Sequence, residues 1–154
     1  MITALLSLAL LTVGTMDPCA ALQPGRTISA RLVTSMHTPG DTMTATVCVV
    51  PMRGMNALKI GSYHGELHFD STTVAVARVE KAEGGVRVEN AMLRGQLNFA
   101  GASPTGFPGR ALVTVVLKLG SASTRPSLRL LIKELNTTDG QKLSQEVVIV
   151  GAPQ

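Results

Sequence analysis

Hydrophobic and polar residues alternate along several short stretches of this chain of 154 residues. Alternation at every second residue is typical of a β-strand with one buried face, because successive side chains point to opposite sides. Glycine- and proline-rich turns separate these stretches, and no segment keeps a helical period. The pattern predicts an all-β sandwich or barrel, with strands over residues 27–35, 42–50, 61–69, 74–79, 86–92, 96–101, 111–119, 128–135 and 147–150.

We expect the fold to be organised around residues 61–80. The first half of this stretch places Tyr63, Leu67 and Phe69 on one face, with Gly65 leaving a gap between them. The chain has one tyrosine, three phenylalanines and no tryptophan, so Tyr63 and Phe69 are expected to anchor the core. Residues 70–73, Asp-Ser-Thr-Thr, predict a turn whose polar side chains bond their own backbone. The opposite face of the strand is polar and carries Ser62, His64, Glu66 and His68.

The most apolar predicted strand covers residues 111–119. Its expected core face carries Ala111, Val113, Val115, Leu117 and Leu119. In the following strand Leu128, Leu130 and Ile132 share a face, and the alternation changes phase near residues 133–135. Such a change indicates a β-bulge, where one strand carries an extra residue.

Residues 2–13 are apolar and uncharged, with about the length of the hydrophobic region of a signal peptide. They are too few to cross a bilayer. Small residues near Ala21 offer a cleavage site, so we expect secretion and no membrane span after the signal is removed. The expected organisation is a signal peptide over 1–21, a linker over 22–26, one domain over 27–150 and a tail over 151–154.

The two cysteines lie on either side of the expected domain start. If Cys19 leaves with the signal peptide, Cys48 remains as a lone, mostly covered thiol, which is the interpretation that we favour. If Cys19 is retained, a disulfide to Cys48 becomes possible.

Charge and aromatic content narrow the classes of function. The formal charge of +4 comes from scattered lysines and arginines, whereas a nucleic-acid site would cluster them. The lack of tryptophan argues against an aromatic platform for stacking on sugars. No Gly-x-Ser-x-Gly motif is present, so the chain shows no nucleophile of the kind that hydrolases use. We therefore expect no enzyme, no nucleic-acid partner and no cofactor.

The sharpest chemical feature is the series His64, Glu66, His68 on one strand face. Neighbouring members of the series lie roughly 6.5–7 Å apart along a strand, so one metal ion would need strong curvature and ligands from another strand. A solvated polar face and a partner-contact face are the other interpretations. We assign no metal ligand.

Several blocks of the chain, in order, resemble the cohesin-domain family. Residues 40–47, Gly-Asp-Thr-Met-Thr-Ala-Thr-Val, are similar to an early strand of that family, and the strand, aromatic-Asp turn and valine-rich strand of residues 61–80 are similar to its central hairpin. Residues 95–100, 109–119 and 136–140 are similar to its later strands and its late acidic-Gly turn. The resemblance covers roughly residues 27–150.

This resemblance implies a single β-sandwich of about nine strands with jelly-roll or Ig-like topology. It also implies a secreted, non-catalytic binding module linked to polysaccharide degradation, with a dockerin-like protein or an extracellular polysaccharide as partner. The contact positions that the resemblance implies are Ser62, His64 and Asn98, with loop positions near Gly101 and Pro104. Glu66 and His68, on the same polar strand face, complete the expected contact residues. The alternatives are a small metal-dependent or hydrolytic enzyme that uses the His64, Glu66 and His68 face, and a structural subunit of the cell envelope.

Overall fold

The computed structural model describes residues 17–37, 41–55, 58–80, 84–120, 126–143 and 147–150, the last of these as backbone only. The expected leader over 2–13 and the tail over 151–154 lie outside these ranges. The described residues form nine strands, β1 (Ser29–Met36), β2 (Thr42–Val50), β3 (Ile60–Phe69), β4 (Val74–Val79), β5 (Val86–Asn90), β6 (Gln96–Ala102), β7 (Ala111–Leu119), β8 (Leu128–Thr137) and β9 (Val147–Val150). Over these same ranges, no helix is long and apolar enough to cross a membrane.

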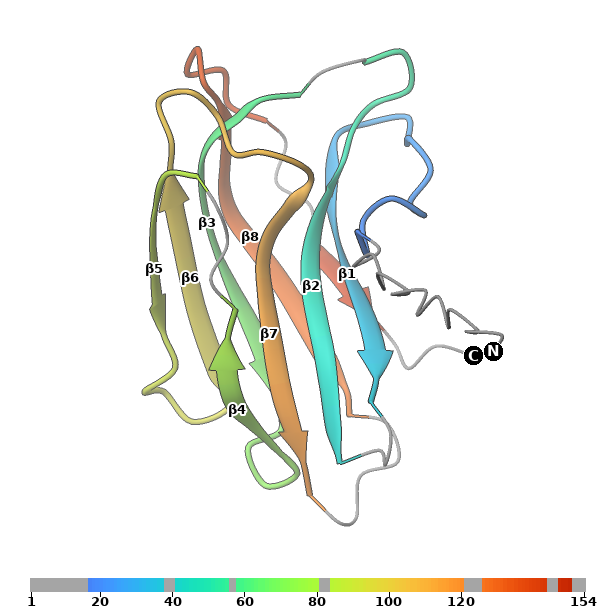
Figure 1. The fold of residues 1–154 in the computed structure, drawn as a ribbon, viewed down its shortest axis with the longest axis vertical. Coiled ribbons are helices and arrows are strands. Elements are labelled where there is room, and N and C mark those ends of the chain that lie inside the picture. The colour runs from blue at the N-terminus through green and yellow to red at the C-terminus, as the bar shows by residue number, and fades with distance from the viewer. Residues whose placement is uncertain are drawn as a thin grey trace, which may run out of the picture.

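Two antiparallel sheets face each other and form a sandwich (Figure 1). One sheet has four strands in the order β1-β2-β7-β4, and the other has five in the order β5-β6-β3-β8-β9. The predicted all-β sandwich is therefore confirmed. β3 lies at the centre of the five-stranded sheet, between β6 and β8, which gives the stretch around residues 61–69 its central position.

The aromatic residues in the core between the sheets are not all the ones that the sequence predicted. Tyr63 and Leu67 are buried as predicted, but Phe69 is only partly buried at the edge of the core. The buried phenylalanines are Phe99 and Phe107, and both rings lie near Tyr63, with centroid distances of 6.2 and 5.1 Å. The expectation that Phe69 is a main anchor is wrong, because Phe69 is the last residue of its strand.

The register of the described strand pairs shifts at four places, and two of these shifts bear on the predicted strands. The pairing of β3 with β8 skips Lys133, so the predicted phase change near residues 133–135 is confirmed. A second irregularity lies between β2 and β7, where Val47 pairs with Val113 and Cys48 pairs with Ala111. The residue skipped there, Leu112, belongs to the core cluster in place of the expected Ala111.

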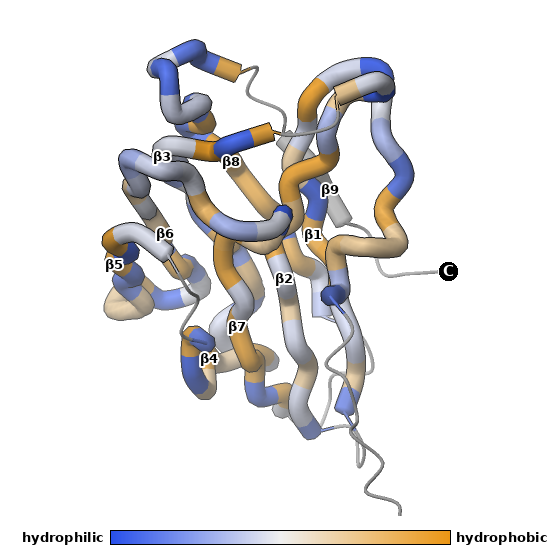
Figure 2. The backbone as a smooth tube through the Cα atoms, turned by 45° about the horizontal axis from the view of Figure 1, so that its top comes forward, coloured by the Kyte–Doolittle hydropathy of each residue, from blue (hydrophilic) through white to orange (hydrophobic). Residues whose placement is uncertain are grey.

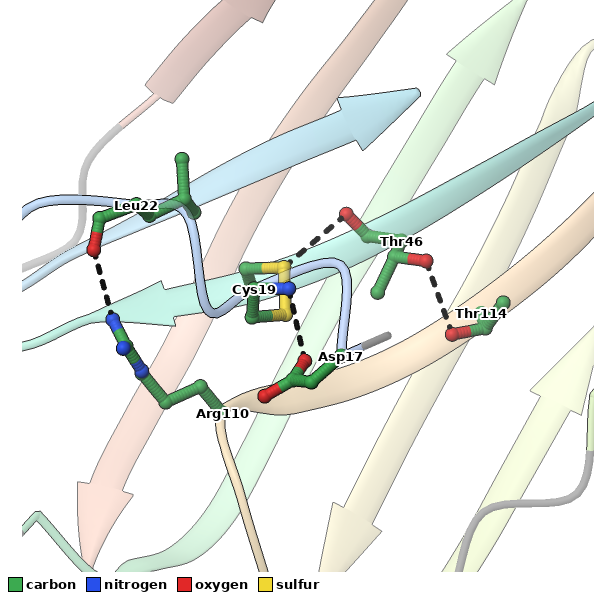
Figure 3. Close-up of a disulfide and its surroundings, with 7 residues drawn as sticks. Asp17, Cys19, Leu22, Thr46, Arg110 and Thr114 are labelled. Atoms are coloured by element: carbon green, nitrogen blue, oxygen red, sulfur yellow. Dashed lines mark hydrogen bonds between the residues drawn. A yellow bond between two sulfur atoms is a disulfide. The ribbon is translucent and has the colours of Figure 1, made fainter. Parts of the chain in front are cut away.

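The N-terminal segment of the described chain is attached to the four-stranded sheet. Cys19 and Cys48 form a disulfide, with Cα atoms 5.5 Å apart. The expectation of a lone Cys48 thiol is therefore wrong for this chain. The reason is geometric, because the segment that carries Cys19 passes over β2 (Figure 3) and brings its sulfur atom to that of Cys48.

Candidate binding face

The outer side of the five-stranded sheet brings together the polar residues that the alternation placed on one side of β3. Ser62, His64, Glu66 and His68 pair across to Ala102, Ala100, Asn98 and Gln96 of β6 in that order. Directly opposite residues of antiparallel strands lie on the same side of the sheet, so Asn98 lies beside Glu66. We call this surface the polar face; it consists of Ser62, His64, Glu66, His68, Gln96 and Asn98.

A charged cluster lies at the middle of the polar face. The side chain of Glu66 is only 11% exposed, although it points away from the core. One carboxylate oxygen accepts a hydrogen bond from Nε2 of His68 at 2.9 Å, and the other accepts one from Nζ of Lys133, the bulged residue of β8. The bond from Lys133 is the main reason that the pKa of Glu66 is lowered, and the bond from His68 acts in the same direction against partial burial.

The other side chains of the polar face differ in the hydrogen bonds that they make to their neighbours. Nδ2 of Asn136 in β8 donates to Oγ of Ser62 at 3.0 Å, and Nε2 of Gln96 donates to Oδ1 of Asn98 at 2.7 Å. The imidazole of His64 makes no hydrogen bond to any other described side chain or backbone group. Its imidazole is therefore the member of the face with its donor and acceptor both available.

Two exposed valines border the polar face, and sequence reasoning did not include them. Val86 pairs with Ala102 and Val88 pairs with Ala100, so both share the side of His64. They are 71% and 64% exposed, on the edge strand β5, which alternates between hydrophobic and polar residues (Figure 2). The alternation of Val86-Arg87-Val88-Glu89 was a usable signal, but alternation alone does not tell which side is buried.

One expected contact position lies on the wrong side of the sheet. Gly101 pairs with Tyr63, and a Cβ atom on Gly101 would lie 2.6 Å from Cζ of the Tyr63 ring. The glycine therefore faces the core, where it makes room for the aromatic ring. It does not belong to the outer contact surface.

The described residues hold no group of three or more histidine, cysteine, aspartate or glutamate side chains placed to bind a metal ion. Both oxygens of Glu66 already accept hydrogen bonds from His68 and Lys133. A cavity of about 550 Å³ lies at one end of the sandwich, lined by Pro24, Val49, Pro51, Met55, Leu58, Lys59, Ile60, Phe107, Gly109 and Arg110. These lining residues supply two cations but no nucleophile, carboxylate or imidazole.

Comparison with known proteins finds similarity in structure but not in sequence. No family model and no curated protein matches the chain. A chain of the type I cohesin–dockerin complex Coh-OlpA–Doc918 from Clostridium thermocellum matches with a TM-score of 0.59 and 12% identity, over 77% of this chain and 92% of that one. The non-cellulosomal cohesin of the archaeon Archaeoglobus fulgidus matches with a TM-score of 0.60 and 18% identity, over 77% and 83% of the two chains.

A further match is the structure of the sixth cohesin of scaffoldin B from Acetivibrio cellulolyticus, solved with a Cel5 dockerin. Its TM-score is 0.58 at 13% identity, over 81% of this chain and 99% of that one. TM-scores of 0.58 to 0.60 at identities this low show a shared fold. The described chain has a cohesin-like fold, as the sequence resemblance predicted.

Proposed function

We propose that this cohesin-like domain is a secreted, non-catalytic binding module whose polar face contacts a dockerin-type protein. The single observation that carries the proposal is the polar face itself, which spans β3 and β6 and is bordered by exposed apolar side chains on β5. Exposed apolar side chains with polar groups beside them are typical of a surface that binds another protein. The cohesin-like fold supports the class of partner, because two of the similar structures are described as complexes with dockerins.

The environment of each residue suggests how the face would bind. The carboxylate of Glu66 is paired with the ammonium group of Lys133 and accepts a hydrogen bond from His68, so the centre of the face presents no uncompensated charge. His64 offers an unpaired donor and acceptor, and Val86 and Val88 offer apolar area. A partner that buries the valines and hydrogen-bonds His64 would use both kinds of group.

The setting that we propose is polysaccharide degradation outside the cell, where the module would hold a partner protein in place. The aromatic content leaves little for direct stacking on sugars: the chain has one tyrosine and no tryptophan, and Tyr63 is 3% exposed, within the core. We therefore place a protein partner ahead of a polysaccharide.

Calorimetric titration of the full chain with purified type I dockerin modules and with soluble polysaccharides tests the class of partner. The expected result is saturable binding of one dockerin per domain and no heat signal with polysaccharides. Saturable binding of a polysaccharide, with no response to any dockerin, would contradict the proposal.

A further inference from the structure

The last residues of β2 are buried on both sides of their sheet. Val47 and Val49 belong to the core between the sheets. Cys48 and Val50 are each 0% exposed but lie outside that core cluster, because they point to the outer side. An outer side of a sandwich is normally solvated, so something else covers this end of β2.

The segment over residues 17–25, which we call the strap, lies against this end of β2 and covers Cys48 through Cys19. Cys19 in the strap is 0% exposed and is bonded to Cys48. The backbone around it forms a turn, in which the Ala20 amide donates to the Asp17 carbonyl at 3.0 Å. Oδ1 of Asp17 also accepts a hydrogen bond from the Cys19 amide at 2.9 Å (Figure 3).

The far end of the strap is also fixed to the domain. Nη1 of Arg110 donates to the Leu22 carbonyl at 3.1 Å (Figure 3). The Gly25 amide donates to the Pro51 carbonyl at 3.0 Å, and the Gly25 carbonyl accepts from the Arg53 amide at 2.9 Å. The strap is therefore joined to the sandwich by a covalent bond near its start and by backbone pairing at its end.

We infer that the strap is part of the mature, folded protein, and that removal of any leader stops before Asp17. A chain that begins near Leu22 would lack Cys19. It would leave a thiol on Cys48 and uncover the outer side of that residue. The domain on this account begins with the strap, ten residues before the strand pattern first becomes visible at residue 27.

Formation of the disulfide also requires an oxidation step during maturation of the protein. The Cys19 and Cys48 thiols exchange with the disulfide of a dithiol oxidant: a new S–S bond forms between them, the oxidant's S–S bond is cleaved, and the oxidant leaves as its dithiol, carrying both protons and both electrons. Such a bond persists in oxidising compartments and is reduced in an ordinary cytosol. The structure thus supports export to an oxidising space on grounds that do not depend on the hydrophobic leader or on the proposed partner.

Mass spectrometry of the full chain, expressed in a bacterium that exports it, tests both parts. The exported protein is unfolded in denaturant and treated with iodoacetamide, once without reductant and once after reduction. We expect an N-terminus at Asp17 or upstream of it, no alkylation of the unfolded protein without reductant, and alkylation of both cysteines after reduction. An N-terminus downstream of Asp17, or alkylation of Cys48 in the unfolded protein without reductant, would overturn the inference.

Limited trypsin digestion gives a second readout that does not depend on export. Arg26 is exposed directly after the strap, so cleavage there frees the strap from the backbone. In wild type the cleaved strap should stay attached until reductant is added, whereas in Cys19→Ser it should be lost at once. Arg53→Gln serves as a matched control, because it leaves the disulfide and the Arg26 site intact. Release of the wild-type strap without reductant would contradict the account.

Discussion

At the scale of single residues, two glycines of the five-stranded sheet leave room for aromatic rings in the core. Gly65 pairs with Phe99, and a Cβ atom on Gly65 would lie 2.5 Å from Cζ of that ring. Gly101 pairs with Tyr63 in the same way. An aromatic ring opposite a glycine covers the backbone that the missing side chain exposes. The gap at Gly65 could be predicted from the sequence. The residue that fills this gap could not, because it lies on another strand.

Replacement of Phe99 by alanine should therefore cost about 3–5 kcal/mol of unfolding free energy, the range for a buried phenylalanine. The matched variant Phe69→Ala should cost clearly less, because Phe69 is only partly buried. Urea unfolding followed by circular dichroism measures both. An equal loss in the two variants would show that the core is not centred on Phe99.

The Glu66 cluster predicts an acid-dependent loss of stability. The pKa of Glu66 lies below its ordinary value of 4.5, first because of the bond from Lys133. A lowered folded pKa means that the carboxylate stabilises the fold fully above that ordinary value, and that this contribution is lost as the pH falls through the folded value. The difference in unfolding free energy between wild type and Glu66→Gln should therefore be largest above about pH 5 and shrink below it. A difference that stays constant down to about pH 3 would contradict this.

At the scale of elements, the sequence pattern predicted β2, β7 and β9 with the bounds that the structure shows. Those strands have regular alternation or a short apolar run between clear turns, and the bulge at Lys133 was visible because it shifts the alternation. The strap was missed for a physical reason: its fold comes from a disulfide and from pairing with distant residues, neither of which leaves a periodic pattern. The apolar run at the end of β2, Val47-Cys48-Val49-Val50, was the available signal, since it indicates burial on both sides.

Removal of the disulfide should destabilise the domain without changing its fold. The double variant Cys19→Ser/Cys48→Ser should lose about 2–4 kcal/mol, the usual range for a disulfide that restricts the unfolded chain. Urea unfolding with and without reductant measures the loss. Wild type in reductant should approach the double variant, which should itself not respond to reductant. If the two proteins unfold at the same midpoint without reductant, the disulfide does not stabilise the native chain.

At the scale of the whole molecule, the two sheets present different outer sides. The four-stranded sheet carries the strap over one end of β2, whereas the five-stranded sheet presents the polar face and the exposed valines of β5. The position of these polar residues on one side could be predicted from alternation within β3. The hydrogen bonds that these residues make could not be predicted. Their partners Lys133 and Asn136 lie on β8, more than sixty residues further along the chain.

Affinity measured for variants of the two outer sides tests the central claim most directly. The double variant His64→Ala/Val88→Ala removes the unpaired imidazole and part of the apolar border, while Arg31→Ala/Lys118→Ala removes two exposed cations from the other sheet. With a dockerin module that binds wild type, calorimetric titration should show at least about tenfold weaker binding for the first variant, equal to ~1.4 kcal/mol. It should show unchanged binding for the second. Wild-type affinity in the first variant, or a comparable loss in the second, would contradict a binding site on the polar face.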